Sequence, residues 1–176
     1  MKCKTCKVKF TPKQFLQKCC CTDHEYEYSM ILLAEKQKKK DIVRKEELRP
    51  LKFYRDKAQR AFNAYIVLRD KGLKCISCNA TDGVKWSCGH YKTSGANPHL
   101  TFNEDNCAAQ CWYSCNSNKS GNIVNFRIGL IERIGLDRVE ALENNHNTDK
   151  KSYTKEELLE IEKLYKNKLK QLREST

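Results

Sequence analysis

The sequence predicts an α+β fold in which a small zinc-clamped core is flanked by helices and preceded by a second zinc module. Two close cysteine pairs, Cys75-x-x-Cys78 and Cys111-x-x-x-Cys115, enclose short strand patterns. Four thiolates in two such pairs can hold one structural zinc. Helical patterns lie on both sides of these pairs, and a further cysteine-rich stretch occupies the N-terminus.

The composition limits the size of the core and the class of protein. The chain has 176 residues, of which 39% are hydrophobic and 32% are charged, so metal sites would offset a small core. No apolar run reaches the length of a membrane span, and the first residues lack the apolar centre of a secretion signal. We therefore expect a cytoplasmic protein, whose eleven cysteines indicate metal ligands rather than disulfides.

The positive charge is concentrated ahead of the cysteine-rich core. Residues 1–74 hold 20 Lys and Arg against 9 Asp and Glu, whereas residues 75–122 hold 3 against 3. Residues 123–176 hold 11 against 10. An excess of positive charge beside a candidate metal site predicts a polyanionic partner, in particular nucleic acid.

Residues 1–28 are expected to form the N-terminal zinc module. Cys3-x-x-Cys6 is a knuckle-type pair, and three adjacent cysteines and His24 follow it. Cys20, the middle one of the three, lies four residues before His24, so one helical turn would place both on one face. Which of the three adjacent cysteines binds stays open, and the preferred ligand set is Cys3, Cys6, Cys20 and His24.

Residues 29–52 are expected to be a basic helical connector. Thr22 and Glu25 fit a capping box at the start of this helix, and Pro50 should end it. A second helix should follow at about 53–70, with an apolar stripe on one side and basic residues elsewhere. The candidate DNA contacts are Lys38, Lys39, Lys40, Arg44, Lys45, Lys52, Arg55, Arg60 and Lys119.

Residues 53–135 are expected to contain the zinc-supported core with its flanking helices. Residues 84–86 predict a short strand that leads to His90, and residues 100–102 predict its return strand. From about Cys111 a short helix should run to near residue 120, and a longer apolar helix should follow it.

Residues 136–176 are expected to form a C-terminal helical region. A short helix is predicted at 136–142, and a capping box from Thr154 to Glu157 predicts the start of the last helix. The apolar stripe of that helix fits either a core face or the seam of a homodimer, and the sequence leaves both open.

The second cysteine pair of the core could be chosen in two ways. Cys107, Cys111 and Cys115 are each four residues apart. We prefer the pair 111/115, because it seats Asn116 beside a backbone held by the metal. The expected zinc ligands of the core are Cys75, Cys78, Cys111 and Cys115.

Three residues near these cysteines are candidates for catalysis. Hydrolysis of a phosphodiester needs an activated water and a divalent cation on the phosphate. His90 could take the proton of that water, and the amide oxygen of Asn116 could help to hold Mg²⁺ or Mn²⁺. His90 is also a candidate ligand of that cation, and Asn106 could cross-link the neighbouring loop.

This layout is that of zinc-supported ββα-metal, or HNH, nucleases, and the chain resembles one family in more detail. From about residue 53 onward it is similar to the NinG, or Rap, recombination proteins of lambdoid phages. The matching segments are Ala61-Phe62-Asn63-Ala64-Tyr65-Ile66, Arg69-Asp70-Lys71-Gly72-Leu73, Cys75-Ile76-Ser77-Cys78, Gly89-His90-Tyr91, Phe102-Asn103-Glu104-Asp105-Asn106, Asn116, Lys119-Ser120-Gly121-Asn122 and Leu130-Ile131-Glu132-Arg133-Ile134-Gly135.

The resemblance implies a structure-specific endonuclease that cuts Holliday junctions and D-loops with a divalent metal. It also implies a phage or prophage origin, the host cytoplasm as location, and host or phage recombination proteins as partners. The chain departs from the family at two places. Ser87 and Cys88 stand where members carry an Asp, for which Glu104 or Asp105 could compensate, and the second cysteine pair has one extra residue.

A second function fits the same residues. A zinc-stabilised protein that binds DNA without cutting it would also carry the basic segments and the cysteine clusters. A zinc deaminase would need Glu two residues after its histidine, whereas Tyr91 and Lys92 follow His90.

Overall fold

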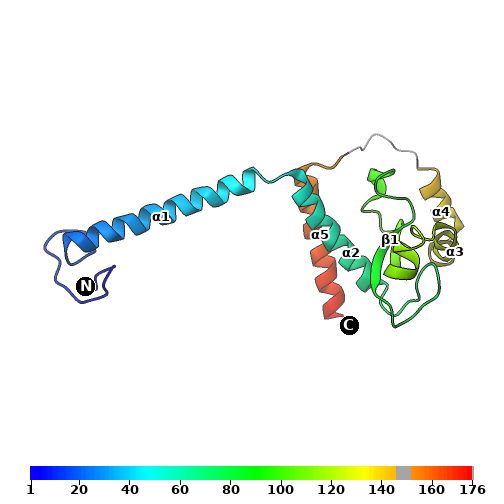
Figure 1. The fold of residues 1–176 in the computed structure, drawn as a ribbon, viewed down its shortest axis with the longest axis horizontal. Coiled ribbons are helices and arrows are strands. Elements are labelled where there is room, and N and C mark those ends of the chain that lie inside the picture. Colours follow the sequence, from blue (N-terminus) through cyan, green and yellow to red (C-terminus); the bar gives the residue numbers. More distant parts are fainter. Residues whose placement is uncertain (146–151, 176) are drawn as a thin grey trace. The chain divides into compact units, whose positions relative to one another are not determined.

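The computed structural model describes residues 1–145 and 152–175 (Figure 1). The chain divides into two compact units, residues 1–49 and residues 50–176. Helices and one small antiparallel sheet make up the described residues, which confirms the α+β prediction. The finer division into four parts, 1–28, 29–52, 53–135 and 136–176, stays a prediction.

The first unit is a cysteine-rich loop followed by helix α1 (Thr22–Glu47). The loop folds back on itself, because the amide of Cys3 donates to the carbonyl of Val8 and a single bridge pairs Lys2 with Lys9. The helix begins where the sequence predicts, but the expected capping box is absent. Cys21 is the N-cap residue and no side chain caps the helix.

The second unit is built on a hairpin of two strands, β1 (Trp86–His90) and β2 (Cys107–Cys111). The strands pair so that His90 lies opposite Cys107 and Trp86 opposite Cys111. The helices of this unit are α2 (Leu51–Arg69), α3 (Ile123–Ile134), α4 (Leu136–Glu143) and α5 (Lys155–Glu174).

Two layers of helices cover the hairpin. Helices α2 and α5 lie side by side over one face (Figure 1), where Phe62, Ile66 and Tyr165 pack with the hairpin. Helices α3 and α4 cover the other face through Phe126 and neighbouring apolar residues. The apolar stripe of α5 is therefore a core face, and the capping box at Thr154 is present as predicted.

The predicted return strand at 100–102 was placed too early in the chain. Residues Pro98–Leu100 form a 3₁₀ turn instead, and the return strand is β2. Pro98 has no amide proton for a strand ladder, which favours the turn. All five residues of β2 are buried, since its small side chains Ala108 and Ala109 allow helices to pack on both faces.

The short helix expected from Cys111 is confirmed only in part. Cys111 is the last residue of β2, and a π-helical turn follows at Trp112–Ser117. The hairpin and α3 approach each other closely at Gly89. A Cβ atom there would lie 2.6 Å from Gln110 Oε1 and 2.8 Å from the ring of Phe126.

The described helices contain no candidate membrane span. Among residues 1–145 and 152–175, no helix combines the length and the hydropathy that crossing a bilayer requires.

Asp70 connects three elements of the second unit at the end of α2. It is 4% exposed, and its Oδ2 accepts hydrogen bonds from the amide of Ala109 in β2 and from Arg133 in α3, both at 2.8 Å. Its Oδ1 accepts a bond from Arg69 at 2.7 Å. One buried carboxylate therefore fixes the position of α2, β2 and α3 relative to one another.

Removing this carboxylate should destabilise the second unit strongly. We expect Asp70→Ala to lower the free energy of unfolding by about 3–5 kcal/mol, because the buried amide of Ala109 and two arginines lose their acceptor. Urea unfolding of the zinc-loaded chain measures this. Asp56→Ala is the matched control on α2, since its ion pair with Lys52 is exposed and should contribute about 1 kcal/mol or less. Equal losses in both variants would contradict the role of Asp70.

Candidate functional site

The four core cysteines come together as the sequence predicts. The sulfur atoms of Cys75, Cys78, Cys111 and Cys115 all lie within 4.8 Å of one another. The first pair lies in a knuckle turn, where the amide of Asn79 donates to the carbonyl of Cys75. The amide of Cys111 donates to Cys75 Sγ at 3.3 Å. Four sulfur donors at this spacing fit a tetrahedral zinc, so the cluster could hold that ion.

The extra residue of the second cysteine pair is taken up by the backbone. Cys111 ends β2, and Cys115 lies inside the π-helical turn Trp112–Ser117. A π-helical turn contains one more residue than an α-helical turn. The three-residue gap therefore still returns the second sulfur to the cluster.

The N-terminal cysteines and His24 form a second cluster. The ligand atoms of Cys3, Cys6, Cys20 and His24 lie within 4.8 Å of one another, and Cys20 Sγ is 3.0 Å from His24 Nδ1. Of the three adjacent cysteines, only Cys20 is in the cluster. Cys19 is buried beside Thr5, and Cys21 is exposed. Three sulfurs and one imidazole also suit zinc, and this cluster could hold it.

His90 is the last residue of β1 and is half-buried. Its Nε2 lies 3.1 Å from the carbonyl oxygen of Thr101, and its ring packs beside Phe62. Burial lowers the pKa of His90, although the hydrogen bond to Thr101 partly opposes this. A carbonyl can only accept, so Nε2 carries the proton and the other ring nitrogen of the neutral ring keeps a lone pair.

Asn116 lies in the π-helical turn and contacts the middle of β1. Its Nδ2 donates to Ser87 Oγ at 2.8 Å, and that hydroxyl donates to the carbonyl of Gln110 at 3.0 Å. With the amide nitrogen used in this way, the amide oxygen of Asn116 is the atom that could bind a cation. Successive side chains of a strand point to opposite faces, so Ser87 and His90, three residues apart, do not share a face of the hairpin.

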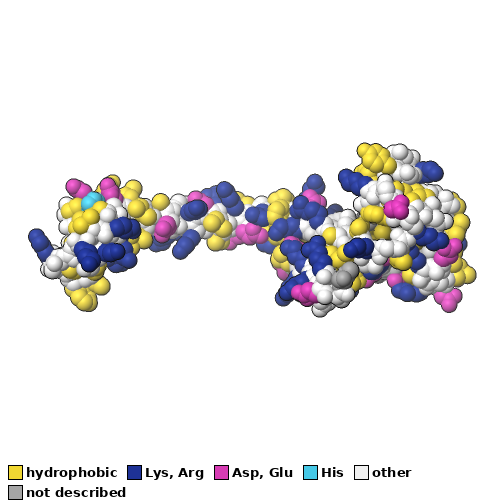
Figure 2. All heavy atoms as spheres, turned by 90° about the horizontal axis from the view of Figure 1, so that it is seen from below, with side chains coloured by type: hydrophobic (Ala, Val, Ile, Leu, Met, Phe, Trp, Pro, Cys, Tyr) yellow, Lys and Arg dark blue, Asp and Glu magenta, His cyan; other side chains and the backbone are white. Residues whose placement is uncertain are grey.

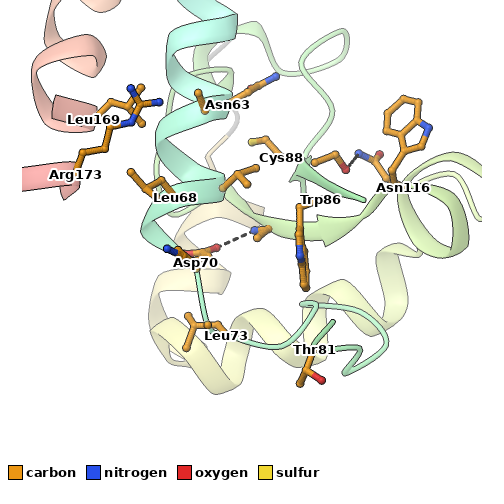
Figure 3. Close-up of a pocket in the computed structure, with 17 residues that line it drawn as sticks. Asn63, Leu68, Asp70, Leu73, Thr81, Trp86, Cys88, Asn116, Leu169 and Arg173 are labelled. Carbon is orange, nitrogen blue, oxygen red and sulfur yellow. Dashed lines mark hydrogen bonds between the residues drawn. The ribbon is translucent and has the colours of Figure 1, made fainter. Parts of the chain in front are cut away.

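A cavity of about 550 Å³ opens beside Ser87 and Asn116. Figure 3 shows Asn116, Trp86 and Cys88 on the hairpin side of this cavity, and Leu169 and Arg173 on the α5 side. Lys71 also lines it. Sequence reasoning did not single out these two basic residues, because Lys71 directly follows the helix predicted at about 53–70 and Arg173 lies near the end of the chain, far in sequence from the cysteine pairs.

Asn106 has a structural role. It is fully buried, its Oδ1 accepts from the amide of Lys92, and its Nδ2 donates to the carbonyls of Lys92 and Leu100. The predicted cross-link of the loop is thus present. These bonds occupy its amide group and position the segment that follows His90, and a direct part of Asn106 in catalysis stays a prediction.

The two carboxylates that could replace the missing Asp are engaged elsewhere. Glu104 accepts hydrogen bonds from Tyr65 and Lys168. Asp105 pairs with Arg138. Neither carboxylate lines the cavity beside Asn116 within the part of the chain that the structure describes.

The candidate DNA-contacting residues are all exposed. Lys and Arg side chains spread over α1 and over the visible face of the second unit (Figure 2), with acidic residues between them. Lys119 is exposed three residues after Asn116. The exposed members on α1 and α2 are Lys38, Lys39, Lys40, Arg44, Lys45, Lys52, Arg55 and Arg60.

The sequence also failed to reveal a third group of metal-binding residue types. Cys88, His90 and Cys107 place their ligand atoms within 4.8 Å of one another. The alternation of β1 could have linked Cys88 with His90, but Cys107 was hidden because the return strand was placed at 100–102.

The cluster geometry predicts how zinc content responds to single cysteine changes. We expect Cys20→Ser and Cys78→Ser each to bind one zinc fewer than the unchanged chain, because each removes a ligand of one cluster. Cys21→Ser should keep the full content, since that thiol lies outside the clusters. Mass spectrometry of metals in the purified, reduced chain measures this. Loss of zinc from Cys21→Ser with retention in Cys20→Ser would show that a different cysteine binds.

Comparison with known proteins identifies the family. The family model described as the bacteriophage lambda NinG protein matches residues 1–175. Protein ninG of Escherichia phage 933W is 39% identical over 99% of this chain and 94% of its own length. Protein ninG of Escherichia phage lambda is 45% identical over 76% of this chain and 64% of its own length. No solved structure shows a significant match. The chain belongs to the bacteriophage NinG family.

Proposed function

We propose that this chain is a metal-dependent endonuclease that cuts branched recombination intermediates, namely Holliday junctions and D-loops. The proposal rests on the hydrogen bond and the protonation of the His90 ring. A carbonyl holds its Nε2 proton at the end of β1, burial favours the neutral ring, and the second nitrogen can accept a proton. A general base needs this arrangement.

The surrounding elements support a ββα-metal core. The hairpin β1–β2 is followed directly by the π-helical turn that carries Asn116, and the four-cysteine cluster ties this turn to the knuckle at Cys75. Zinc in that cluster would have a structural role only, because four protein ligands leave no open position for substrate.

The catalytic cation would be held mainly by Asn116. Mg²⁺ usually keeps several waters and takes few protein oxygens together with phosphate oxygens, and the amide oxygen of Asn116 fits this need. When bound, Mg²⁺ or Mn²⁺ would stabilise the negative charge that develops on the phosphate. Arg173 and Lys71, which line the same cavity, would bind neighbouring phosphates.

In the proposed reaction His90 removes a proton from the attacking water, and the oxygen of that water bonds to the scissile phosphorus. The bond from phosphorus to the leaving sugar oxygen then breaks, and that oxygen takes up a proton from solvent to leave as a hydroxyl. Ser87 and His90 are three residues apart in β1, so about 10 Å of strand separates their Cα atoms. Because the two side chains lie on opposite faces, the scissile phosphate would have to lie at the outer edge of β1, which among the described residues pairs only with β2, so that His90 and a cation at Asn116 could approach it from either face.

The exposed Lys and Arg side chains of α1 and α2 would hold the arms of the branch. Contacts with phosphates position DNA without reading its sequence, so selectivity for branches would come from shape. A homodimer would suit symmetric cutting of a four-way junction. The site of action would be the cytoplasm of the infected host, with other recombination proteins as partners.

A second function rests on one specific observation. Ser87 supplies only a hydroxyl beside Asn116, and Glu104 and Asp105 are bound to other residues. A chain without a carboxylate at the cation would bind branched DNA and not cut it.

Cleavage assays separate the two functions. We expect nicking of labelled four-way junctions and D-loops in Mg²⁺ or Mn²⁺, little cutting of linear duplex, and none in EDTA. His90→Ala should lower the rate about 10²–10⁴-fold, the usual contribution of a general base. His99→Ala is the matched control and should cut normally. Tight binding of the junction without cutting in any cation would favour the second function.

A substitution at Ser87 tests the proposed cation site by gain of activity. Ser87→Asp would add a negatively charged ligand next to Asn116, so it should lower several-fold the Mg²⁺ concentration that gives half-maximal cleavage. Ser87→Asn, similar in size but uncharged, is the control and should not produce this shift. An unchanged Mg²⁺ requirement in Ser87→Asp would place the cation elsewhere.

A further inference from the structure

Cys88, His90 and Cys107 form a third group of potential metal ligands that belongs to neither zinc cluster. Cys88 and His90 are two residues apart on one face of β1, and Cys107 is paired with His90 in the ladder. Their ligand atoms lie within 4.8 Å of one another. In a tetrahedral site with Zn–S bonds of about 2.3 Å, sulfur atoms lie about 3.8 Å apart. Small side-chain rotations would therefore bring the three donors onto one cation.

The surroundings of His90 match those of a metal-bound histidine. A ligating histidine almost always donates its other ring proton to a carbonyl or carboxylate. Here Nε2 faces the carbonyl of Thr101, which leaves the second nitrogen for a cation. The backbone of Cys107 is fixed as well, because its carbonyl accepts a hydrogen bond from Arg69 at 2.9 Å.

The type of donor and the accessibility of the group define the cation. Two soft thiolates and one borderline imidazole favour Zn²⁺ or Cu⁺ over Mg²⁺. Cys107 is 1% exposed and Cys88 is 9% exposed. Cys88 also lines the cavity shown in Figure 3, so a cation could enter from that side without unfolding the hairpin.

We propose that Cys88, His90 and Cys107 form a third metal site, which takes a thiophilic cation such as Zn²⁺ or Cu⁺ with an open fourth position. The site differs from the two clusters because it has three protein ligands instead of four. A cation bound there would occupy the lone pair of His90. It would therefore inhibit cleavage reversibly, a consequence that rests on the proposed function.

Metal counting tests the site without any activity assay. The reduced chain, titrated under anaerobic conditions with Zn²⁺ alone or with Cu⁺ alone, should bind one equivalent more than Cys88→Ala or Cys107→Ala. Cys19→Ala removes a buried cysteine outside the three groups and should bind as much as the unchanged chain. Titration with Co²⁺ should give a separate set of absorption bands that both site variants lack.

Several results would overturn the site. One is equal metal content in the unchanged chain and in both site variants. Another is a loss of two free thiols on mild oxidation with no extra equivalent in the reduced chain, which would indicate a Cys88–Cys107 disulfide. Each variant must keep its other zinc equivalents and its helical circular dichroism, so that misfolding is not mistaken for loss of the site.

Inhibition is a second and separate readout. Micromolar Zn²⁺ added to Mg²⁺ reactions should lower junction cleavage by the unchanged chain at least about tenfold, as sequestration of a general base implies. Cys107→Ala should resist this inhibition. If no variant cuts any junction, the proposed function fails while the metal count still decides the site. Equal inhibition of Cys107→Ala would show that Zn²⁺ acts elsewhere.

Discussion

The second unit depends on one buried carboxylate at the end of α2. Asp70 accepts hydrogen bonds from an amide of β2 and from arginines on α2 and α3. A buried charge is tolerated only where such partners surround it. The position of the hairpin against the helices is thus set by a polar contact, while the apolar side chains on each face fill the remaining space. The residues at the candidate site are held in place by this frame.

The four-cysteine cluster, which could hold zinc, adds a second kind of constraint to this frame. The four-cysteine cluster joins the knuckle at Cys75, the end of β2 and the π-helical turn, which are short segments with few apolar side chains of their own. A metal there would replace the hydrophobic burial that these segments lack. Asn116 would gain a fixed position from the same clamp, because it follows Cys115 directly.

Much of the architecture could be predicted from the sequence, for identifiable reasons. The α5 stripe and the α2 stripe follow the helical period, and the cysteine spacing identifies the clusters. The return strand is β2 and not 100–102, because Leu100-Thr101-Phe102 alternates like a strand, whereas Cys107–Cys111 combines small residues with one buried Gln and shows no apolar–polar alternation. Its burial on both faces is a tertiary property that a local pattern does not contain.

Only those residues of the candidate site that lie next to a recognisable sequence motif could be predicted. His90 and Asn116 could be found because each adjoins a recognisable motif. Arg173 reaches the cavity from the far end of the chain, and the proximity of Cys107 to His90 depends on strand register. Neither of these two proximities follows from the spacing of the residues in the sequence.

The π-helical turn has a consequence for how such proteins are recognised. Because of this turn, two cysteines that are separated by three residues can bring their sulfur atoms together as well as two cysteines with fewer residues between them. Searches that require a fixed number of residues between cysteines would therefore overlook chains like this one. Distant sequences are better compared by the conformation of the backbone between the two cysteines than by the number of residues that separates them.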